Sequence, residues 1–282
     1  MAKKLLLPFL LALILIGCQK QEDIIITPSN NPFEVMPERF QQNILLEHFS
    51  DEAQSVTVEN SLFVDQLKSK YPSRLIVANF HQNDFLATSY SSFLGTSLGG
   101  LLSISKGSIN RNIGKQTLAQ EDGQVLLSPQ NWEGAILQAL QKPDAPLSIS
   151  LETGTEANDV GFVKVYIAHK TSISPTAKLV VYLLEDNIQP IFQNGNQIGF
   201  SHQNVFKNLL TEYEGDSIDL TGSSEKGLIH KSTFTNIDLN NYNVANLKVI
   251  AFVYENHPDF KQKQILNSQE ANFYGVHYWD ID

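Results

Sequence analysis

The chain of 282 residues contains a single cysteine, Cys18, so no second thiol is present with which it could pair. An intramolecular disulfide is therefore excluded, and the folded part must be stabilised by burial of apolar side chains. Thiol–disulfide exchange is also excluded beyond residue 18, because it requires a nucleophilic thiolate and a resolving thiol. No cofactor is predicted from the sequence.

Positive charge is also scarce. The chain has 20 Lys and Arg residues against 30 Asp and Glu residues, which gives a formal net charge of −10. Proteins that bind nucleic acids build their affinity from Lys and Arg side chains that neutralise phosphates. Because no basic cluster here is longer than Lys3–Lys4, we expect no nucleic-acid partner.

The N-terminal apolar segment, Leu5 to Ile16, is too short for a membrane helix, which needs about 20 residues. Lys3 and Lys4 precede it and Gly17 follows it, as in a signal peptide covering residues 1–17. Its removal leaves 18 basic and 30 acidic residues, a net charge of −12. The sequence Leu15-Ile16-Gly17-Cys18 resembles the bacterial lipobox, which implies that Cys18 is acylated and anchors the chain to a membrane.

The residues after Cys18 indicate which membrane. Gln19 is not the aspartate that retains proteobacterial lipoproteins in the inner membrane, so we expect the outer membrane. Glu22-Asp23 is similar to the acidic signals that export lipoproteins of Bacteroidota to the cell surface. The alternative is an ordinary signal peptide with an incidental cysteine.

Two domains are expected after a tether. Residues 18–39 are rich in proline and lack an apolar period, which is typical of a flexible linker. Ile44–Phe49 and Leu75–Phe80 are apolar runs of strand length, and Val58–Tyr71 between them has one apolar helical face. This order predicts a βαβ unit with parallel strands, within an α/β domain of residues 40–143.

A helix is expected over Ala87–Leu94, strands near Ser103 and Ile109, and a helix between Ser128 and Pro143. Residues 144–282 are predicted to form an antiparallel, β-sandwich-like domain, because short apolar strands dominate it. The expected strands are 148–151, 162–168, 179–184, 231–234, 247–254 and 263–266, with one helix at about His202–Tyr213.

Several motifs, in order, resemble one family: Ile44–Ser50, Ala78–Phe85, Gly107–Arg111, Ser201–Phe206 and Leu247–Tyr254. The family comprises Bacteroidota lipoproteins related to the twenty-eight-kilodalton outer-membrane protein of Porphyromonas. The resemblance covers about residue 40 to the end. It implies an α+β fold, in which a thioredoxin-like domain is followed by a β-rich domain.

The resemblance also implies where a redox centre would lie. Family members with a CxxC motif would carry it at Gln54 and Thr57, and Ser105-Lys106 stands where they place a proline. We therefore expect a redox-inactive thioredoxin-like domain and a binding role rather than an enzyme. The resemblance favours a surface receptor or adhesin for a protein or polysaccharide ligand. A periplasm-facing envelope-assembly factor shares every one of these sequence features.

A secreted serine hydrolase is the alternative from another class. Gly95–Gly99 matches the G-x-S-x-G nucleophile elbow with Ser97 as the nucleophile, although a helix is expected before it. Gly215–Ile218 resembles the first block of GDSL-type hydrolases with Ser217, but no histidine has an aspartate three residues before it.

The seven histidines are scattered singly and predict no metal site. His81 and Asp84 are expected on a solvated loop. Asp238–Asn243 has oxygen ligands but lacks the glycine and terminal glutamate of a calcium loop, so we expect a turn. The aromatic tail, Phe273–Trp279, is expected to pack against the β-rich domain, and a contact patch is the alternative.

Overall fold

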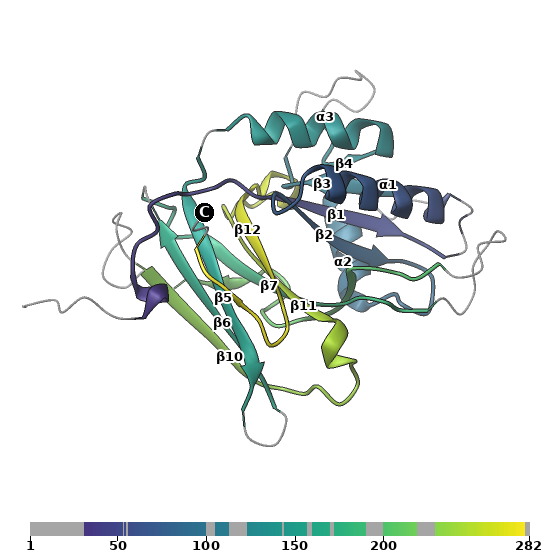
Figure 1. Cartoon of the computed structure of the whole chain (residues 1–282). Coiled ribbons are helices and arrows are strands. Elements are labelled where there is room, and N and C mark those ends of the chain that lie inside the picture. Colours follow the sequence, from purple (N-terminus) through teal and green to yellow (C-terminus); the bar gives the residue numbers. More distant parts are fainter. Residues whose placement is uncertain are drawn as a thin grey trace, which may run out of the picture.

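The computed structural model describes residues 31–52, 54, 56–99, 105–112, 123–142, 144–156, 160–169, 172–189, 200–218 and 229–279. Three α-helices and two β-sheets make up this part of the chain (Figure 1). The helices are α1 (Thr57–Lys70), α2 (Ser89–Leu98) and α3 (Pro129–Leu140). The mixed α+β fold predicted from the sequence is confirmed.

The strands of the larger sheet are β1 (Ile44–Ser50), β2 (Leu75–His81), β3 (Lys106–Ile109), β4 (Leu126–Leu127), β7 (Lys178–Glu185), β8 (Val205–Leu209), β9 (Asp216–Ser217), β11 (Leu247–Tyr254) and β12 (Ile265–Asn272). The strands of the smaller sheet are β5 (Leu147–Thr155), β6 (Gly161–His169), β10 (Ile229–Ile237) and β13 (Val276–His277).

Strands β1 and β2 form the predicted parallel pair, with Ile44 opposite Leu75 and Ser50 opposite His81. Every residue of both strands is buried, which explains why their sequences are nearly continuous apolar runs. Helices α1 and α3 cover one face of this pair, and α2 covers the opposite face (Figure 1). The βαβ unit predicted from the sequence is confirmed.

One sheet connects the two halves of the chain. Its order is β12-β11-β7-β8-β2-β1-β3-β4, and β9 pairs with β7. The junction is the parallel contact of Asn79 in β2 with Val205 in β8. Strands from before and after residue 143 are therefore hydrogen-bonded within one sheet, although the sequence predicts a domain boundary near this residue.

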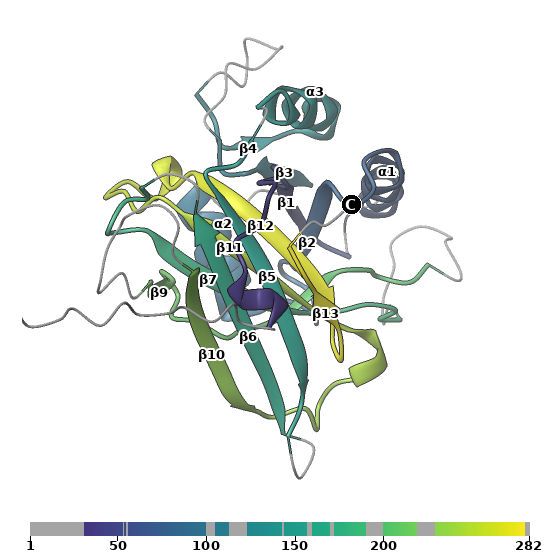
Figure 2. The ribbon, with the colours of Figure 1, turned by 60° about the vertical axis from the view of Figure 1, so that its left-hand side comes forward.

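The smaller sheet, in the order β10-β6-β5-β13, packs against one face of the larger sheet (Figure 2). Alternate residues of β7 face it, such as Leu179, Val181 and Leu183, and they form a core with Ile149 and Val165. The intervening residues of β7, such as Tyr182, point to the opposite face and form a second core with side chains of α2. This alternation is that of a sheet buried on both faces.

The helix predicted at His202–Tyr213 is wrong, because Val205–Leu209 form strand β8 instead. The register against β7 shifts between Leu183 and Leu184, which leaves Lys207 as an extra residue in β8. This bulge turns Phe206 and Leu209 to the same face, where both contact the α2 core. The i, i+3 spacing that indicates a helix thus arises from a bulged strand.

A buried ion pair lies inside that core, and its hydrogen bonds with Tyr182 connect it to the second half of the chain. The Arg111 guanidinium donates to both carboxylate oxygens of Glu47, at 2.7 and 2.8 Å, and to the Tyr182 hydroxyl at 3.0 Å. Glu47 is fully buried and Arg111 is 1% exposed. Aromatic rings surround the guanidinium, because those of Phe252 and Phe260 lie 5.1 and 5.2 Å from its carbon.

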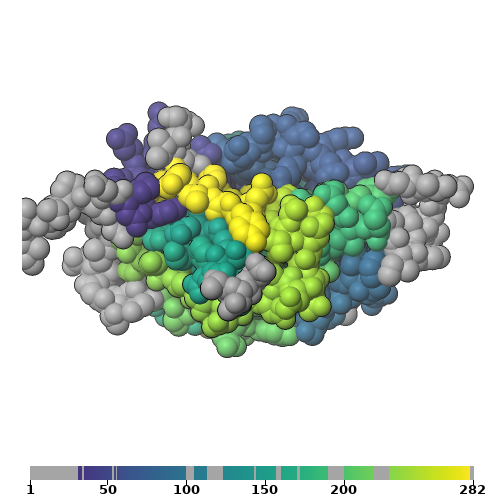
Figure 3. Space-filling model, turned by 60° about the horizontal axis from the view of Figure 1, so that its bottom comes forward, coloured from purple at the N-terminus to yellow at the C-terminus, as the bar shows by residue number. Residues whose placement is uncertain are grey.

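The segments near both ends of the described chain meet on the smaller sheet. Phe33 stacks on Tyr166 at 4.5 Å and on Tyr278 at 4.9 Å, measured between ring centroids. Trp279 is buried, and its indole Nε1 donates to the Pro32 carbonyl at 3.0 Å. Figure 3 shows the C-terminal residues in yellow beside the purple N-terminal segment. The packing expected for the aromatic tail is thus observed for Trp279, while Tyr274 and Tyr278 remain exposed.

Candidate functional site

The carboxyl ends of parallel strands commonly carry the functional groups of an α/β fold. Here β1 ends at Ser50, and the chain turns tightly before α1. The N–H of Gln54 donates to the Asp51 carbonyl at 3.0 Å, and the N–H of Thr57 donates to the Gln54 carbonyl at 3.1 Å. The Thr57 hydroxyl also donates to the Asp51 carbonyl. Gln54 and Thr57, which sequence comparison placed at the CxxC positions, are thus part of a hydrogen-bonded turn.

Two histidine–carboxylate pairs lie beside this turn. His202 Nε2 is 2.7 Å from Glu52 Oε1, and His81 Nδ1 is 2.8 Å from Asp84 Oδ2. The two imidazole rings are 4.7 Å apart and nearly perpendicular. The His81 and Asp84 side chains are only 1% and 7% exposed, so the prediction of a solvated loop is wrong. Burial of these polar side chains is tolerated because each has a hydrogen-bond partner.

These environments lower the pKa values of both His202 and Asp84, but burial acts on the two groups in opposite directions. Burial, together with proximity to His81, lowers the pKa of His202 to about 4. Burial acts to raise the pKa of the Asp84 carboxyl, but hydrogen bonds from His81, Glu52 and Leu86 outweigh burial and leave this pKa below its ordinary value. His202 is therefore neutral and Asp84 ionised at pH 7.

A second group of side chains, His48, Asn79 and Ser105, lies deeper between β1, β2 and the residue before β3. Asn79 Nδ2 donates to the Gln203 carbonyl, which can only accept, so Asn79 Oδ1 faces His48 Nδ1 at 2.8 Å. This assigns the proton to Nδ1 and leaves the Nε2 lone pair for the Ser105 hydroxyl at 2.6 Å. Burial lowers the pKa of His48 to about 4, so the ring is neutral at pH 7.

This order of groups is that of a hydroxyl, a base and an orienting amide. Ser105, however, is only 3% exposed, and His48 is fully buried with the Trp132 ring 5.1 Å away. A substrate cannot reach the hydroxyl in this structure. The three side chains therefore fix β1, β2 and the start of β3 relative to one another.

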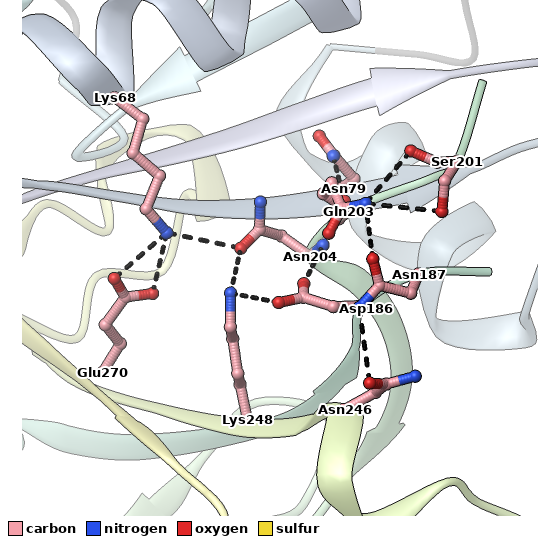
Figure 4. A network of polar contacts seen from close by, with 10 residues as sticks. All are labelled: Lys68, Asn79, Asp186, Asn187, Ser201, Gln203, Asn204, Asn246, Lys248 and Glu270. Atoms are coloured by element: carbon pink, nitrogen blue, oxygen red, sulfur yellow. Dashed lines mark hydrogen bonds and ion pairs between the residues drawn. The ribbon is translucent and has the colours of Figure 1, made fainter. Parts of the chain in front are cut away.

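Asn204 connects these groups to the β-rich half (Figure 4). Its backbone is in the left-handed region, with φ of 54°. Its carbonyl accepts from the Asn79 N–H at 2.8 Å, and its N–H donates to Asp186 at 2.7 Å. Its side-chain oxygen accepts from Lys68 at 3.3 Å and Lys248 at 3.2 Å. Asn204 thus bonds to α1, β2 and β11 at once.

The outer part of this network consists of ion pairs. Lys68 pairs with Glu270 at 3.0 Å, and Lys248 pairs with Asp186 (Figure 4). Each positive charge in the network has a carboxylate partner. The arrangement therefore holds β8 against its neighbours and leaves no excess positive charge for an anionic ligand.

The serines proposed for a hydrolase lie elsewhere. Ser97 is in the last turn of α2, so it lacks the strand-to-helix turn that a nucleophile elbow requires. Ser217 is in β9, and its hydroxyl accepts from Lys178 Nζ at 2.9 Å. Among the described residues, no histidine hydrogen bonds to either serine. The geometry does not support a nucleophile at Ser97 or Ser217.

Two further predictions concern metals and the anchor. Within the part of the chain that the structure describes, no group of three or more His, Cys, Asp or Glu residues could hold a metal ion. The Asp238 carboxylate accepts from the Asn240 N–H at 3.0 Å, which is the expected turn. Cys18 lies outside the described residues. None of the described helices is both long and apolar enough to cross a membrane.

The fold defines a class of protein in which a thioredoxin-like unit is joined to a β-sandwich. The family model of the outer membrane protein Omp28 matches residues 96–273. The chain therefore belongs to the Omp28 family of outer membrane proteins. This confirms the family resemblance found in the sequence motifs and supports association with the outer membrane.

Solved structures give the same fold. HBP35 of Porphyromonas gingivalis is similar with a TM-score of 0.69 and 19% identity, over 86% of this chain and 79% of that one. A protein of Agrobacterium tumefaciens is similar with a TM-score of 0.54 and 9% identity, over 83% of this chain and 96% of that one. No curated protein matches the chain. These structural similarities confirm the thioredoxin-like and β-rich architecture.

Two groups of buried polar side chains were not predicted from the sequence. The contact of His81 with His202 carries no sequence signal, because these residues come from opposite halves of the chain and only the contact between β2 and β8 brings them together. His48 with Asn79 could have been found, because both occupy the same position in two strands predicted to be parallel neighbours. An apolar run interrupted by polar residues at matched positions is a signal for a buried polar contact.

Proposed function

We propose that this protein is a lipoprotein, anchored to the outer membrane through Cys18, whose folded part is a binding module without thiol redox activity. One observation carries the proposal: the turn after β1 contains Gln54 and Thr57, both held by main-chain hydrogen bonds, where a dithiol would act. The chain has no cysteine beyond Cys18. The turn therefore lacks a nucleophile for thiol exchange.

The surroundings of the turn also favour a structural role. Glu52 and His202 close it from one side, and both are at most 3% exposed. A reductase needs an exposed sulfur that a substrate disulfide can approach. A module that binds its partner elsewhere needs only a stable fold, which these buried pairs provide.

The first experiment measures reductase activity of the mature chain with an insulin-precipitation assay, using a CxxC-containing thioredoxin as the positive control. We expect no activity above the uncatalysed rate. Catalysis by the purified chain would contradict the proposal.

The second experiment tests the anchor and its orientation. Cells are labelled with a radioactive or alkyne fatty acid, and we expect the wild type but not Cys18→Ser to carry label. Protease is then added to intact cells, with a periplasmic protein as the integrity control. Loss of the chain while the control survives would support a surface receptor or adhesin. Protection would exclude that role and favour a periplasm-facing assembly factor.

The serine hydrolase remains testable with the same purified chain. We expect no labelling by a serine-reactive fluorophosphonate. Labelling that Ser97→Ala or Ser217→Ala abolishes would establish the enzyme in place of the binding module.

A further inference from the structure

A pocket of about 440 Å³ opens between the end of β8 and the second half of β10, the outer strand of the smaller sheet. Its volume lies in the range of small-molecule sites. Leu210, Phe234 and Tyr242 line it, and all three are partly buried side chains packed against the sandwich core. The core is therefore open to ligand at this edge.

Most of the remaining lining residues are polar. Asn208, Asn236 and Asn241 contribute three side-chain amides, and Thr235 and Asp238 add a hydroxyl and a carboxylate. Each amide carries both a donor and an acceptor. The Asn208 side-chain oxygen accepts from the Leu209 N–H at 2.9 Å, and its NH2 group can donate to a ligand. Apolar and aromatic surface thus lies beside groups that both donate and accept hydrogen bonds.

Asn236 occupies an irregular position in the strand. The register of β10 against β6 breaks between Phe234 and Ile237, and Asn236 has a φ of 59°. A bulge of this kind changes the direction of a side chain relative to the regular alternation of a strand. Asparagine is one of the few residues that adopts this conformation at low cost. The bulge therefore brings an additional amide to the pocket.

The charge of the described lining disfavours an anionic ligand. Among the described residues that line the pocket, Asp238 is the single charged one, and none of them is a Lys, Arg or His. The chain as a whole has a net charge of −10. A phosphorylated, sulfated or uronic acid ligand would meet a carboxylate without a compensating cation.

We propose that this pocket binds a neutral glycan, whose hydroxyls pair with the amides of Asn208, Asn236 and Asn241 while a sugar ring packs on Phe234 and Tyr242. Hydroxyls donate and accept, so they satisfy both ends of each amide. The apolar side chain of a peptide would cover the same rings but would offer no hydrogen-bonding group to the amides around them. This inference rests on the proposed binding role and names its ligand class.

The test uses the purified mature chain and saturation-transfer NMR, followed by calorimetry on each positive ligand. The neutral probes are maltotriose, cellotriose, mannotriose, xylotriose and N,N′,N″-triacetylchitotriose. Trigalacturonate serves as the anionic probe, and a nine-residue peptide with alternating Phe and Thr serves as the peptide probe. We expect saturation transfer to at least one neutral trisaccharide and none to trigalacturonate.

Three variants locate the binding. Asn236→Gly keeps the left-handed backbone and removes the amide, Asn241→Ala removes an exposed amide, and Tyr242→Phe removes only a hydroxyl. We expect the first two each to weaken binding about fivefold, the usual effect of losing one hydrogen bond. Gln138→Ala, which removes an exposed amide from α3, should leave the affinity unchanged. Circular dichroism verifies that every variant is folded.

Three outcomes would overturn the proposal: no transfer to any neutral trisaccharide, binding that the pocket variants do not affect, or peptide binding that they weaken. The last would assign the pocket to an extended peptide. The acylation, shaving and reductase experiments are independent of these results, so a failure here does not affect the proposed anchoring or the absence of thiol chemistry.

Discussion

Glu47 and Arg111 place a carboxylate and a guanidinium in a core of aromatic rings, where an unpaired charge would be costly. Both guanidinium–carboxylate hydrogen bonds are short, and the Tyr182 hydroxyl also donates to Glu47 Oε1 at 2.9 Å. The pair favours one packing arrangement more than it adds net stability. Glu47, Arg111 and Tyr182 are all satisfied only when β1, β7 and the residues after β3 are in this arrangement.

Removal of one partner should be far more harmful than removal of both. We expect Glu47→Gln to lower the free energy of unfolding by about 3–5 kcal/mol, because it leaves Arg111 charged and buried. The double variant Glu47→Leu with Arg111→Met should lose less than the single variant. Lys164→Ala, which breaks the partly exposed pair with Glu152, should cost at most about 1 kcal/mol. Urea unfolding measures all three, and equal losses for single and double variants would contradict this account.

His48 and His202 make stability depend on pH. Both have an ordinary pKa of 6.5 and a folded-state pKa of about 4, chiefly because of burial. Between these values the unfolded chain binds more protons than the folded chain, so stability falls as the pH is lowered from 6.5 to 4.

The slope in this window should be at most about 1.4 kcal/mol per pH unit for each histidine. His202→Gln retains a donor for Glu52 and should reduce the slope. Urea midpoints at several pH values provide the measurement. An unchanged slope in this variant would show that His202 does not titrate on unfolding.

At the scale of the element, strand β8 shows what the sequence could predict and what it could not. The buried runs of β1, β2, β7 and β11 were identifiable, because continuous apolar sequence and length distinguish strands from helices. The bulge in β8 was not, because a strand with one extra residue has the same spacing of apolar positions as a helix. The buried pair of His202 with Glu52 was also hidden, since it depends on β8 lying next to β2.

Asn204 fixes the entry into β8, and its replacement tests this role. Asn204→Ala should lower the free energy of unfolding by about 1–3 kcal/mol, since alanine is strained at this φ and Lys68 and Lys248 lose an acceptor. Asn204→Gly also removes the acceptor, but glycine adopts this φ without strain, so this variant should lose less stability. Thermal unfolding compares the stabilities of the two variants. A more stable alanine variant would contradict the strain argument.

At the scale of the whole molecule, the larger sheet makes the two halves one cooperative structure. Strand β2 pairs with β1 on one side and contacts β8 on the other, and the α2 core includes side chains from β7 and β11. A fragment of residues 40–143 would expose these surfaces to water. The sequence pattern changes near residue 143, but side chains from both sides of this predicted boundary pack in one hydrophobic core.

We therefore expect a single unfolding transition for the mature chain by scanning calorimetry, with equal calorimetric and van't Hoff enthalpies. The isolated fragment 40–143 should lack a cooperative transition. Two separate transitions in the full chain, or a stably folded fragment, would show that the halves fold independently.

The contact of Phe33 and Pro32 with the C-terminal residues also determines how the protein would carry mechanical load. Tension applied through the segment before residue 31 reaches Phe33 first, where ring stacking on Tyr166 and the Trp279 hydrogen bond resist it. The Phe40 carbonyl, which accepts from the Ala145 N–H at 2.7 Å, is a second attachment point before β1. A captured ligand would pull against these two attachments, so the candidate site at β1 and β2 remains unloaded until both have been released.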